Sequence, residues 1–307
     1  MEDGNEAGLV GFRIRYRGGG RSSVCRPDRR CSGAGFVGAE ERGRTMDYCP
    51  LTFEQYFIDN SADYNHTGAT RREIAYKSAS YRCGRVEKFL GLQHEVNYEI
   101  FYETERDVIQ LNFERSVGLG DWVANVVEFS SRYYDSIEYR GEELQLRAHH
   151  GWAEMYRAIK HEVRSAWSEL HRLHPCAHTE IIGWSLGSGQ AILCAQDLNY
   201  NFGVKAYLYT FGTVRPFRYT RKNRMLTEQY LSELCAECYN FANVNDIVTY
   251  LPPFYGFTMP RRVNVGTEKR TLRGLMNPLY FHTSYDNPRL YRKSVLRKRK
   301  TADSGSN

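Results

Sequence analysis

The sequence predicts an α/β protein with a mostly parallel central sheet and helices on both faces of that sheet. Beyond Pro175, short apolar runs alternate with helical patterns as far as residue 265. This alternation is typical of strand–helix–strand units, in which neighbouring strands run parallel. A length of 307 residues, with 41% hydrophobic and 25% charged residues, suits one large globular domain with appendages. The same composition excludes a wholly disordered chain, a collagen and a coiled coil.

The N-terminal half is expected to form a helical region, a hairpin and a long helix. Residues 46–91 place apolar groups three and four apart, notably from Arg71 to Tyr76, and this spacing predicts helix. Residues 98–113 predict a hairpin, because two runs of apolar and polar residues flank a polar turn. The longest helical pattern covers 152–173 and ends before Pro175.

The C-terminal half supplies the alternating strands and helices. Strands are predicted where β-branched and aromatic residues gather, and helices where apolar residues recur at helical spacing. In chain order these are a strand at 179–183, a helix at 186–199, a strand at 204–211, a helix at 224–235, and strands at 239–244 and 262–265.

The basic charge of the chain belongs to its two ends. The formal net charge is +6, yet residues 1–45 hold nine Arg against six acidic residues, and 289–307 hold seven Lys and Arg against Asp303. The segment between them is therefore slightly acidic. A basic core built for nucleic acid is not indicated, so no specific nucleic-acid partner is expected.

These ends also set the expected domain boundaries. Residues 1–45 are rich in Gly and Arg without periodicity, which predicts a disordered extension, and Met46 is an alternative natural start. Residues 46–288 form the predicted globular domain. Residues 289–307 are a basic, disordered tail, for which a nuclear address, contact with anionic lipid and simple solubilisation stay open.

The expected location is cytoplasmic or peripheral to a membrane. No run of about 18 apolar residues predicts a membrane-spanning helix, and the first residues lack the apolar core of a secretory signal. Eight cysteines are too few for a disulfide scaffold in this length, so free thiols in a reducing compartment are expected. Nuclear association and the host, a virus included, are left open.

The sharpest motif is Gly183-Trp184-Ser185-Leu186-Gly187, between an apolar strand and a helix that opens with small residues. A nucleophile on a tight strand-to-helix turn needs small residues two positions to either side, here Gly183 and Gly187. The turn lifts the Ser185 hydroxyl out of the sheet and directs the helix N-terminus toward it. The alternative is a Gly/Ser turn without chemistry.

A serine hydroxyl needs a base to take its proton and an acid to orient that base. His282 is the only histidine downstream of Ser185, which makes it the candidate base. Asp246 is the favoured acid because it alone directly follows an apolar strand, where catalytic loops of such sheets lie. The other acids between Ser185 and His282 are Asp197, Glu228, Glu233, Glu237 and Glu268.

Over about residues 97–287 the chain resembles the class 3 (fungal-type) lipases of the α/β hydrolase fold. The nucleophile motif matches, although Trp184 stands where the family usually has His. Three further stretches match in family order: His149-x-Gly151-Trp152, Tyr209-Thr-Phe-Gly212, and Asn243-Val-Asn-Asp246-Ile-Val248 before Leu251-Pro-Pro. The resemblance implies an α/β hydrolase fold with a Ser185–Asp246–His282 triad.

The resemblance also assigns the oxyanion hole and a lid. Backbone N–H groups of Ser116 and Leu186 would form the hole, although Arg115 replaces a glycine of the family before Ser116. The family's lid falls on 117–124, where Leu119 and Trp122 are apolar and glycines flank the segment. The alternative for this segment is a surface turn with Trp122 packed on the core.

The resemblance implies a serine esterase or lipase that cleaves a carboxylic ester of a lipid, an acylglycerol or a phospholipid, without metal or organic cofactor. The expected partners are the lipid ester and the surface of a membrane or lipid droplet. The altered segment at 113–116 motivates an alternative, a weak or inactive α/β-hydrolase pseudoenzyme that binds lipid or protein. Cys235-x-x-Cys238 and the histidines at 171, 174 and 178 lack the partners of a metal site.

Overall fold

The computed structural model describes Tyr48 and residues 71–81, 94–104, 106–113, 131–252, 257–258, 262–265, 277, 279–283 and 285. The chain divides into two units, Met1–Arg44 and Thr45–Asn307, and every described residue lies in the second. The predicted extension and the predicted basic tail lie outside the described residues. No helix among the residues described is long and apolar enough to cross a membrane.

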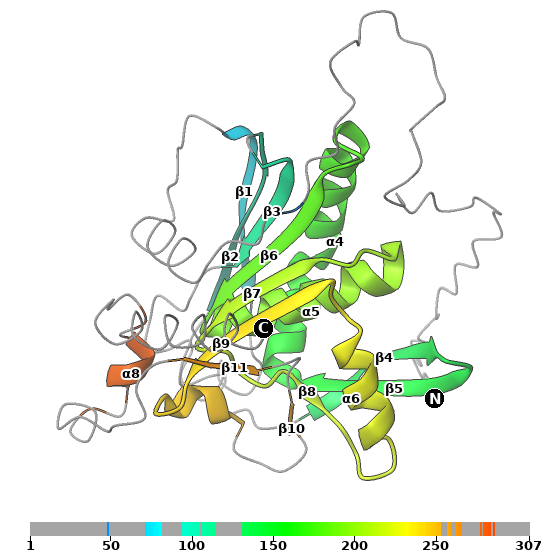
Figure 1. Ribbon diagram of the computed structural model, residues 1–307, viewed down its shortest axis with the longest axis vertical. Helices are drawn as coiled ribbons and strands as arrows, with labels where there is room; N and C mark the ends of the chain where they lie inside the picture. The colour runs from blue at the N-terminus through cyan, green and yellow to red at the C-terminus, as the bar shows by residue number, and fades with distance from the viewer. Residues whose placement is uncertain are drawn as a thin grey trace, which may run out of the picture. The chain divides into compact units, whose positions relative to one another are not determined.

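The centre of the domain is a seven-stranded, mostly parallel sheet (Figure 1). Strands β3, β6, β7, β9 and β11 run parallel, while β1 and β2 add antiparallel strands at one edge. This arrangement confirms the predicted α/β class and the predicted hairpin. Across the sheet, the strands are β1 (Arg71–Tyr81), β2 (His94–Glu103), β3 (Val108–Phe113), β6 (His178–Trp184), β7 (Tyr207–Phe211), β9 (Glu237–Asn243) and β11 (Arg262–Val265).

The helical prediction for Arg71 to Tyr76 is wrong, because these residues begin strand β1. Its backbone pairs with β2 from Arg71 opposite Glu103 to Tyr81 opposite His94. An edge strand beside an existing hairpin gains a full ladder of backbone hydrogen bonds, which outweighs a weak helical spacing.

A second, four-stranded sheet was not predicted from the sequence. Its order is β10 (Phe257–Thr258), β8 (Phe217–Arg218), β5 (Glu142–His149) and β4 (Ser131–Tyr139). The turn between β4 and β5 places Arg140 and Gly141 at φ of 55° and 79°. Two successive residues with positive φ are the mark of the tight hairpin turn whose twist matches that of its strands.

The helices that connect the parallel strands confirm the helical patterns. Helix α4 (His150–Leu173) connects β5 of the second sheet to β6 of the central sheet. Helix α5 (Leu186–Phe202) follows β6, and α6 (Arg224–Ser232) precedes β9. The shorter η1 (Ile247–Tyr250) and α8 (Tyr280–Thr283) follow later in the chain. Helices α4 and α5 contact each other and the sheet. The buried face of α4 carries Trp152, Met155, Tyr156, Ile159, Val163, Trp167 and Leu170.

The two faces of the central sheet carry different side chains. On β6 and β7 the face toward α4 and α5 carries aliphatic side chains, with Ile181 and Leu208 in the larger core cluster. The other face holds an aromatic cluster that includes Trp184, Tyr209 and Phe241. Among the described residues, the cover of this second face consists of Tyr48 and side chains around α8, so the predicted helices on that face lie outside the described residues.

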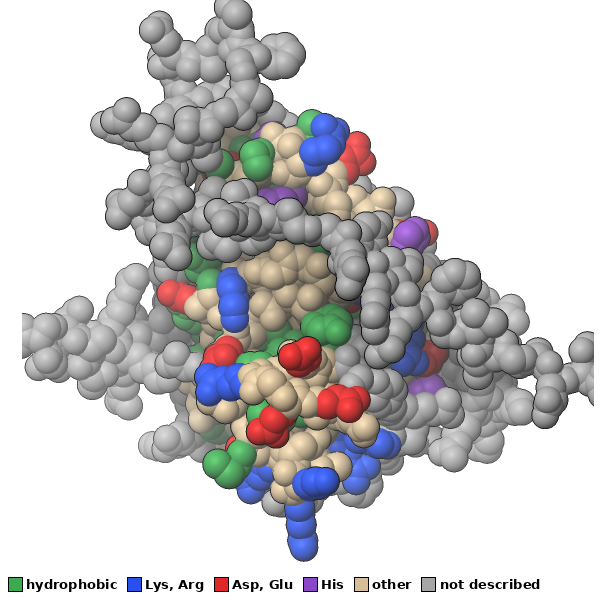
Figure 2. Space-filling model, turned by 90° about the vertical axis from the view of Figure 1, so that its right-hand side faces the viewer, with side chains coloured by type: hydrophobic (Ala, Val, Ile, Leu, Met, Phe, Trp, Pro, Cys, Tyr) green, Lys and Arg blue, Asp and Glu red, His purple; other side chains and the backbone are tan. Residues whose placement is uncertain are grey.

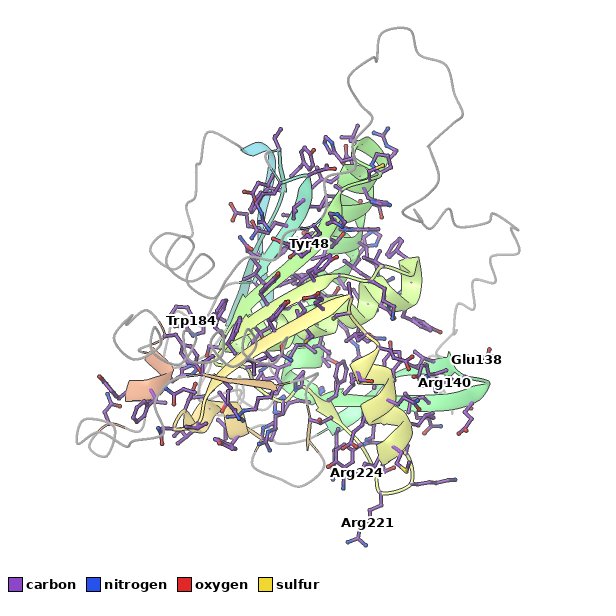
Figure 3. The ribbon with its side chains drawn as sticks, viewed as in Figure 1. Tyr48, Glu138, Arg140, Trp184, Arg221 and Arg224 are labelled. Atoms are coloured by element: carbon purple, nitrogen blue, oxygen red, sulfur yellow. The ribbon has the colours of Figure 1, made fainter. Side chains whose placement is uncertain are left out.

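Tyr48 lies against this second face (Figure 3). Its hydroxyl donates to Glu180 Oε1 at 2.7 Å and lies 2.6 Å from the hydroxyl of Tyr209, and its ring stacks on Tyr207. Arg106 Nη1 donates to the other oxygen of Glu180 at 3.1 Å. Glu180 is fully buried, and a buried carboxylate is tolerated only with such partners. Tyr48 is thereby tied to the sheet.

The described surface in Figure 2 mixes acidic and basic side chains over the β4–β5 hairpin and α6. An example is the exposed ion pair between Arg140 and Glu233. Alternating signs at close range cancel the field that attracts a polyanion.

Candidate active site

Ser185 stands at the sharp turn between β6 and α5. Its backbone adopts φ 56° and ψ −117°, a sparsely populated conformation for a residue with a side chain. The turn is held by Ser185 N–H, which donates to Phe211 O at 2.8 Å, and by Ser185 O, which accepts from Ser188 N–H at 3.0 Å. The surroundings therefore fix the strained turn that presents the Ser185 hydroxyl.

Gly183 is required by the close approach of α5 to β6. A Cβ at this position would lie 2.3 Å from Gly187 O and 2.8 Å from the Cβ of Ala191. Both distances are far below van der Waals contact, and the first involves backbone that cannot yield. The spacing of small residues in the motif thus reflects the packing of the helix directly behind the serine.

The turn brings Ser185 to His282, which is delivered by α8 at the same end of the sheet (Figure 1). His282 Nε2 lies 2.7 Å from Ser185 Oγ. The helical turn begins at Asn277, whose side-chain oxygen accepts from Leu279 N–H and whose carbonyl accepts from Tyr280 N–H. The segment forms one short helical turn, α8.

Asp246 completes the arrangement from the carboxyl end of β9. Its Oδ2 lies 2.9 Å from His282 Nδ1, while its Oδ1 accepts from Val248 N–H at 2.9 Å and so caps η1. A carboxylate on Nδ1 fixes the proton there and leaves Nε2 free to accept the hydroxyl proton of Ser185. The structure thus brings together Ser185, His282 and Asp246.

All three side chains are buried. Ser185 and His282 are 6% exposed, and Asp246 is 0% exposed. Burial removes competing water from the hydrogen bonds between them and strengthens their electrostatic interaction.

The remaining predicted site residues divide into described and undescribed ones. Leu186 is the first residue of α5, so its N–H has no acceptor within the helix, and its role as an oxyanion donor stays a prediction. Ser116, Leu119 and Trp122 lie outside the described residues, and their roles stay predictions.

Two of the other acids are placed away from the triad. Asp197 lies on α5, where it accepts from Arg164 Nε at 2.8 Å and from the Tyr156 hydroxyl at 3.0 Å. Glu237 is exposed at the opposite end of β9 from Asp246. Among the described residues there is no group of three or more His, Cys, Asp or Glu that could hold a metal.

Residues 111–256 match the model of the family described as lipase (class 3). This part of the chain is therefore similar to the class 3 lipase family. The matched segment contains Ser185 and Asp246 and ends before His282, which the structure adds to the same site. No curated protein matches the sequence.

Solved structures similar to this chain are fungal lipases. Rhizomucor miehei triacylglyceride lipase is 21% identical, with a TM-score of 0.44 over 55% of this chain and 62% of that one. A propeptide complex of Rhizomucor miehei lipase is 20% identical, with a TM-score of 0.47 over 69% of this chain and 63% of that one. The mono- and diacylglycerol lipase from Aspergillus oryzae is 19% identical, with a TM-score of 0.46 over 57% of this chain and 61% of that one. The chain thus spans about three fifths of the length of each structure.

Two residues of the candidate site, Tyr285 and Gly212, were given no role from the sequence. Tyr285 is buried, its hydroxyl donates to Asp246 Oδ2 at 3.0 Å, and it accepts from Asn243 N–H at 2.7 Å. Gly212 lies behind His282, with φ of +58°. The position of Tyr285 three residues after His282, one helical turn away, is the sequence signal that points to it.

Replacing Gly212 by alanine should displace His282. A Cβ there would lie 2.8 Å from His282 Cε1 and 3.0 Å from Nδ1, and positive φ is unfavourable for alanine. A shift of about 1 Å in a catalytic group can cost about 100-fold in rate, so kcat for a soluble ester should fall by about that factor. Steady-state kinetics of the purified variant measures it.

Gly203→Ala is the matched control for this change. Gly203 has a φ of +70°, but a Cβ there would meet no atom within 4 Å. It should therefore carry a similar backbone strain and lose thermal stability without losing kcat. An unchanged kcat in Gly212→Ala would contradict the contact with His282.

Replacing Tyr285 by phenylalanine should lower kcat by about tenfold and leave KM nearly unchanged. The change removes one hydrogen bond to Asp246 and one acceptor for Asn243 N–H, and bonds to charged groups are worth about 1.5–3 kcal/mol. Tyr239→Phe is the control, because the Tyr239 hydroxyl donates to Glu237, away from the triad. Equal rates in both variants would exclude a role for Tyr285 in positioning Asp246.

Proposed function

We propose that this chain hydrolyses a carboxylic ester of a lipid, an acylglycerol or a phospholipid, through Ser185, His282 and Asp246. One observation carries the proposal. The Ser185 hydroxyl, on a strained turn at the sheet edge, lies 2.7 Å from His282 Nε2, whose Nδ1 lies 2.9 Å from Asp246. An activated nucleophile requires a serine, a base within reach of its hydroxyl, and a third group that orients the base.

In the proposed reaction each group of the triad takes one step. Ser185 Oγ attacks the ester carbonyl while His282 Nε2 takes the hydroxyl proton, and the new imidazolium is stabilised by Asp246. His282 then gives the proton to the leaving alcohol, and an acyl-enzyme on Ser185 remains. Water repeats the sequence, releases the acid and restores Ser185. The Leu186 N–H, with that of Ser116 as the second expected donor, stabilises the oxyanion, where one donor contributes about 3–4 kcal/mol.

The burial of Ser185 supports an insoluble ester as substrate. A closed site protects the acyl-enzyme from side reactions, and it opens at a cost that contact with a lipid surface can offset. We propose that opening accompanies contact with a membrane or lipid-droplet surface, with 117–124 as the lid. The location peripheral to a membrane or in the cytoplasm belongs to the same proposal.

Reaction with a fluorophosphonate probe tests the activity directly, since only an activated serine is phosphonylated. The full chain should be labelled, Ser185→Ala should not, and a panel of acylglycerol and phospholipid esters should give turnover. A folded chain that takes up no probe and hydrolyses no ester in the presence of lipid would favour the binding pseudoenzyme instead.

A further inference from the structure

Two arginines converge on one exposed tyrosine at the end of η1. The guanidinium carbon of Arg262 lies 4.6 Å from the centre of the Tyr250 ring, and that of Arg215 lies 5.3 Å from the same centre. The Tyr250 hydroxyl donates to Val244 O at 3.2 Å, which fixes the ring between the strand end and the arginines. The three side chains form a cluster that is called the Arg–Tyr–Arg cluster below.

The charge of this cluster is not neutralised within the described part of the chain. Arg262 donates from Nε to Asn264 and from Nη1 to Thr249 O, and its Nη2 is buried without a partner. Among the described residues, no carboxylate contacts Arg215 or Arg262. Burial and the neighbouring Arg262 lower the pKa of Arg215, which is the electrostatic consequence of two cations with no anion between them.

The cluster is attached to two of the three segments that carry the triad, the turn at Ser185 and the loop at Asp246. Arg215 N–H donates to Leu251 O at 2.9 Å, directly after η1, and the preceding residue Val214 donates to Ser188 Oγ at 3.2 Å. Ser188 belongs to the turn that holds Ser185. Along η1, Tyr250 lies four residues beyond Asp246, about 8 Å at the rise of a 3-10 helix.

Exposed apolar surface adjoins these charges. Ile247 and Tyr250, both on η1, are 46% and 42% exposed. An apolar side chain beside two arginines suits a ligand that is both apolar and anionic. The apolar part of such a ligand leaves water while the arginines face its negative charge.

We propose that the Arg–Tyr–Arg cluster is a subsite for the phosphate of a lipid ester, and that the chain therefore prefers anionic phospholipids to neutral acylglycerols. The inference rests on the proposed ester hydrolysis and narrows its substrate. In a glycerophospholipid the phosphate lies a few bonds from the ester carbonyl, so the proposal requires that one molecule places its ester at Ser185 while its phosphate contacts the cluster. Guanidinium groups bind phosphate through paired N–H donors, and the cluster offers two guanidinium groups that contact no carboxylate among the described residues.

The test compares two substrates in the same mixed micelles, phosphatidylglycerol and diacylglycerol with identical acyl chains. Wild type should hydrolyse the phospholipid faster. The double variant Arg215→Gln/Arg262→Gln should lose about 10- to 100-fold in kcat/KM on phosphatidylglycerol and keep its rate on diacylglycerol. Arg215→Lys/Arg262→Lys should recover part of the loss, since it retains charge without the planar fork. Arg221→Gln, an exposed cation on the second sheet's side (Figure 3), controls for net charge.

The outcomes separate this inference from the proposed function and from other anion sources. Parallel losses on both lipids would overturn the subsite, as would unchanged selectivity in the Gln variant. If no ester is hydrolysed at all, the proposed function fails, and sedimentation of Ser185→Ala with phosphatidylglycerol vesicles tests the subsite by itself. In that measurement, weaker vesicle binding by Ser185→Ala/Arg215→Gln/Arg262→Gln than by Ser185→Ala supports the subsite, and equal binding overturns it. Inhibition by glycerophosphate equal to that by lipid would assign the site to free phosphate esters.

Discussion

Replacing Ser185 by alanine is expected to lower kcat for a short p-nitrophenyl ester by about 10⁴-fold or more. Within the described residues, Ser185 Oγ is the hydroxyl that hydrogen-bonds His282 Nε2, so the variant leaves the base without a nucleophile. The thermal midpoint should change little, because the backbone bonds to Phe211 and Ser188 that hold the turn do not involve the hydroxyl. Release of p-nitrophenol and thermal unfolding of the same preparation measure the two quantities.

Ser232→Ala is the control for this experiment. Its hydroxyl donates to Gln229 O on the exposed face of α6, and its removal should change neither quantity. A Ser185→Ala protein that keeps more than about a thousandth of the wild-type kcat would assign the nucleophile to another residue.

Short-range sequence patterns predicted several elements of the fold. Helix α4 and the β6–turn–α5 unit were predictable, because their apolar spacing and small residues act over a few positions. The same holds for the placement of Ser185, since the glycine spacing around it follows from one close helix–strand contact. These elements would form similar local structure in many folds, which is why short-range reasoning reaches them.

The elements that depend on distant partners were not predictable in this way. Strand β1 was expected as helix because its strand character comes from pairing with β2. The β4–β5 hairpin was missed because its turn is Arg140-Gly141, although the alternation of Leu144, Leu146 and Ala148 gives a strand signal. An edge or hairpin strand shows its periodicity only where one face is buried, and burial is decided by the rest of the chain.

The site shows the same division. The approach of His282 to Ser185 spans nearly a hundred residues, and chain order with elimination was enough to propose the pairing. Neither Tyr285 nor Gly212 could be found by that reasoning, because one supports Asp246 and the other limits the space behind His282. Supporting residues are defined by contact with a site and carry no reactive group of their own in a sequence pattern.

Asp246→Asn is expected to lower kcat by about 10⁴-fold while the fold persists. The carboxylate accepts from His282 Nδ1–H, from the Tyr285 hydroxyl and from Val248 N–H, which occupies both of its oxygens. An amide has one oxygen and one NH₂ group, so it either meets one of these donors with a donor or loses the bond to His282. In both cases the imidazole is no longer held with its proton on Nδ1, and Nε2 accepts poorly from Ser185.

The double variant Ser185→Ala/Asp246→Asn should be no slower than Ser185→Ala, because groups that act as one unit are not additive. Asp197→Asn is the matched control, a buried carboxylate on α5 held by Arg164 and Tyr156. Breaking that pair should lower the thermal midpoint by several degrees and leave kcat of the folded protein near wild type. Should Asp246→Asn lose stability but not rate, as expected of Asp197→Asn, the acid of the triad would lie outside the loop that follows β9. Glu268 would be the next candidate.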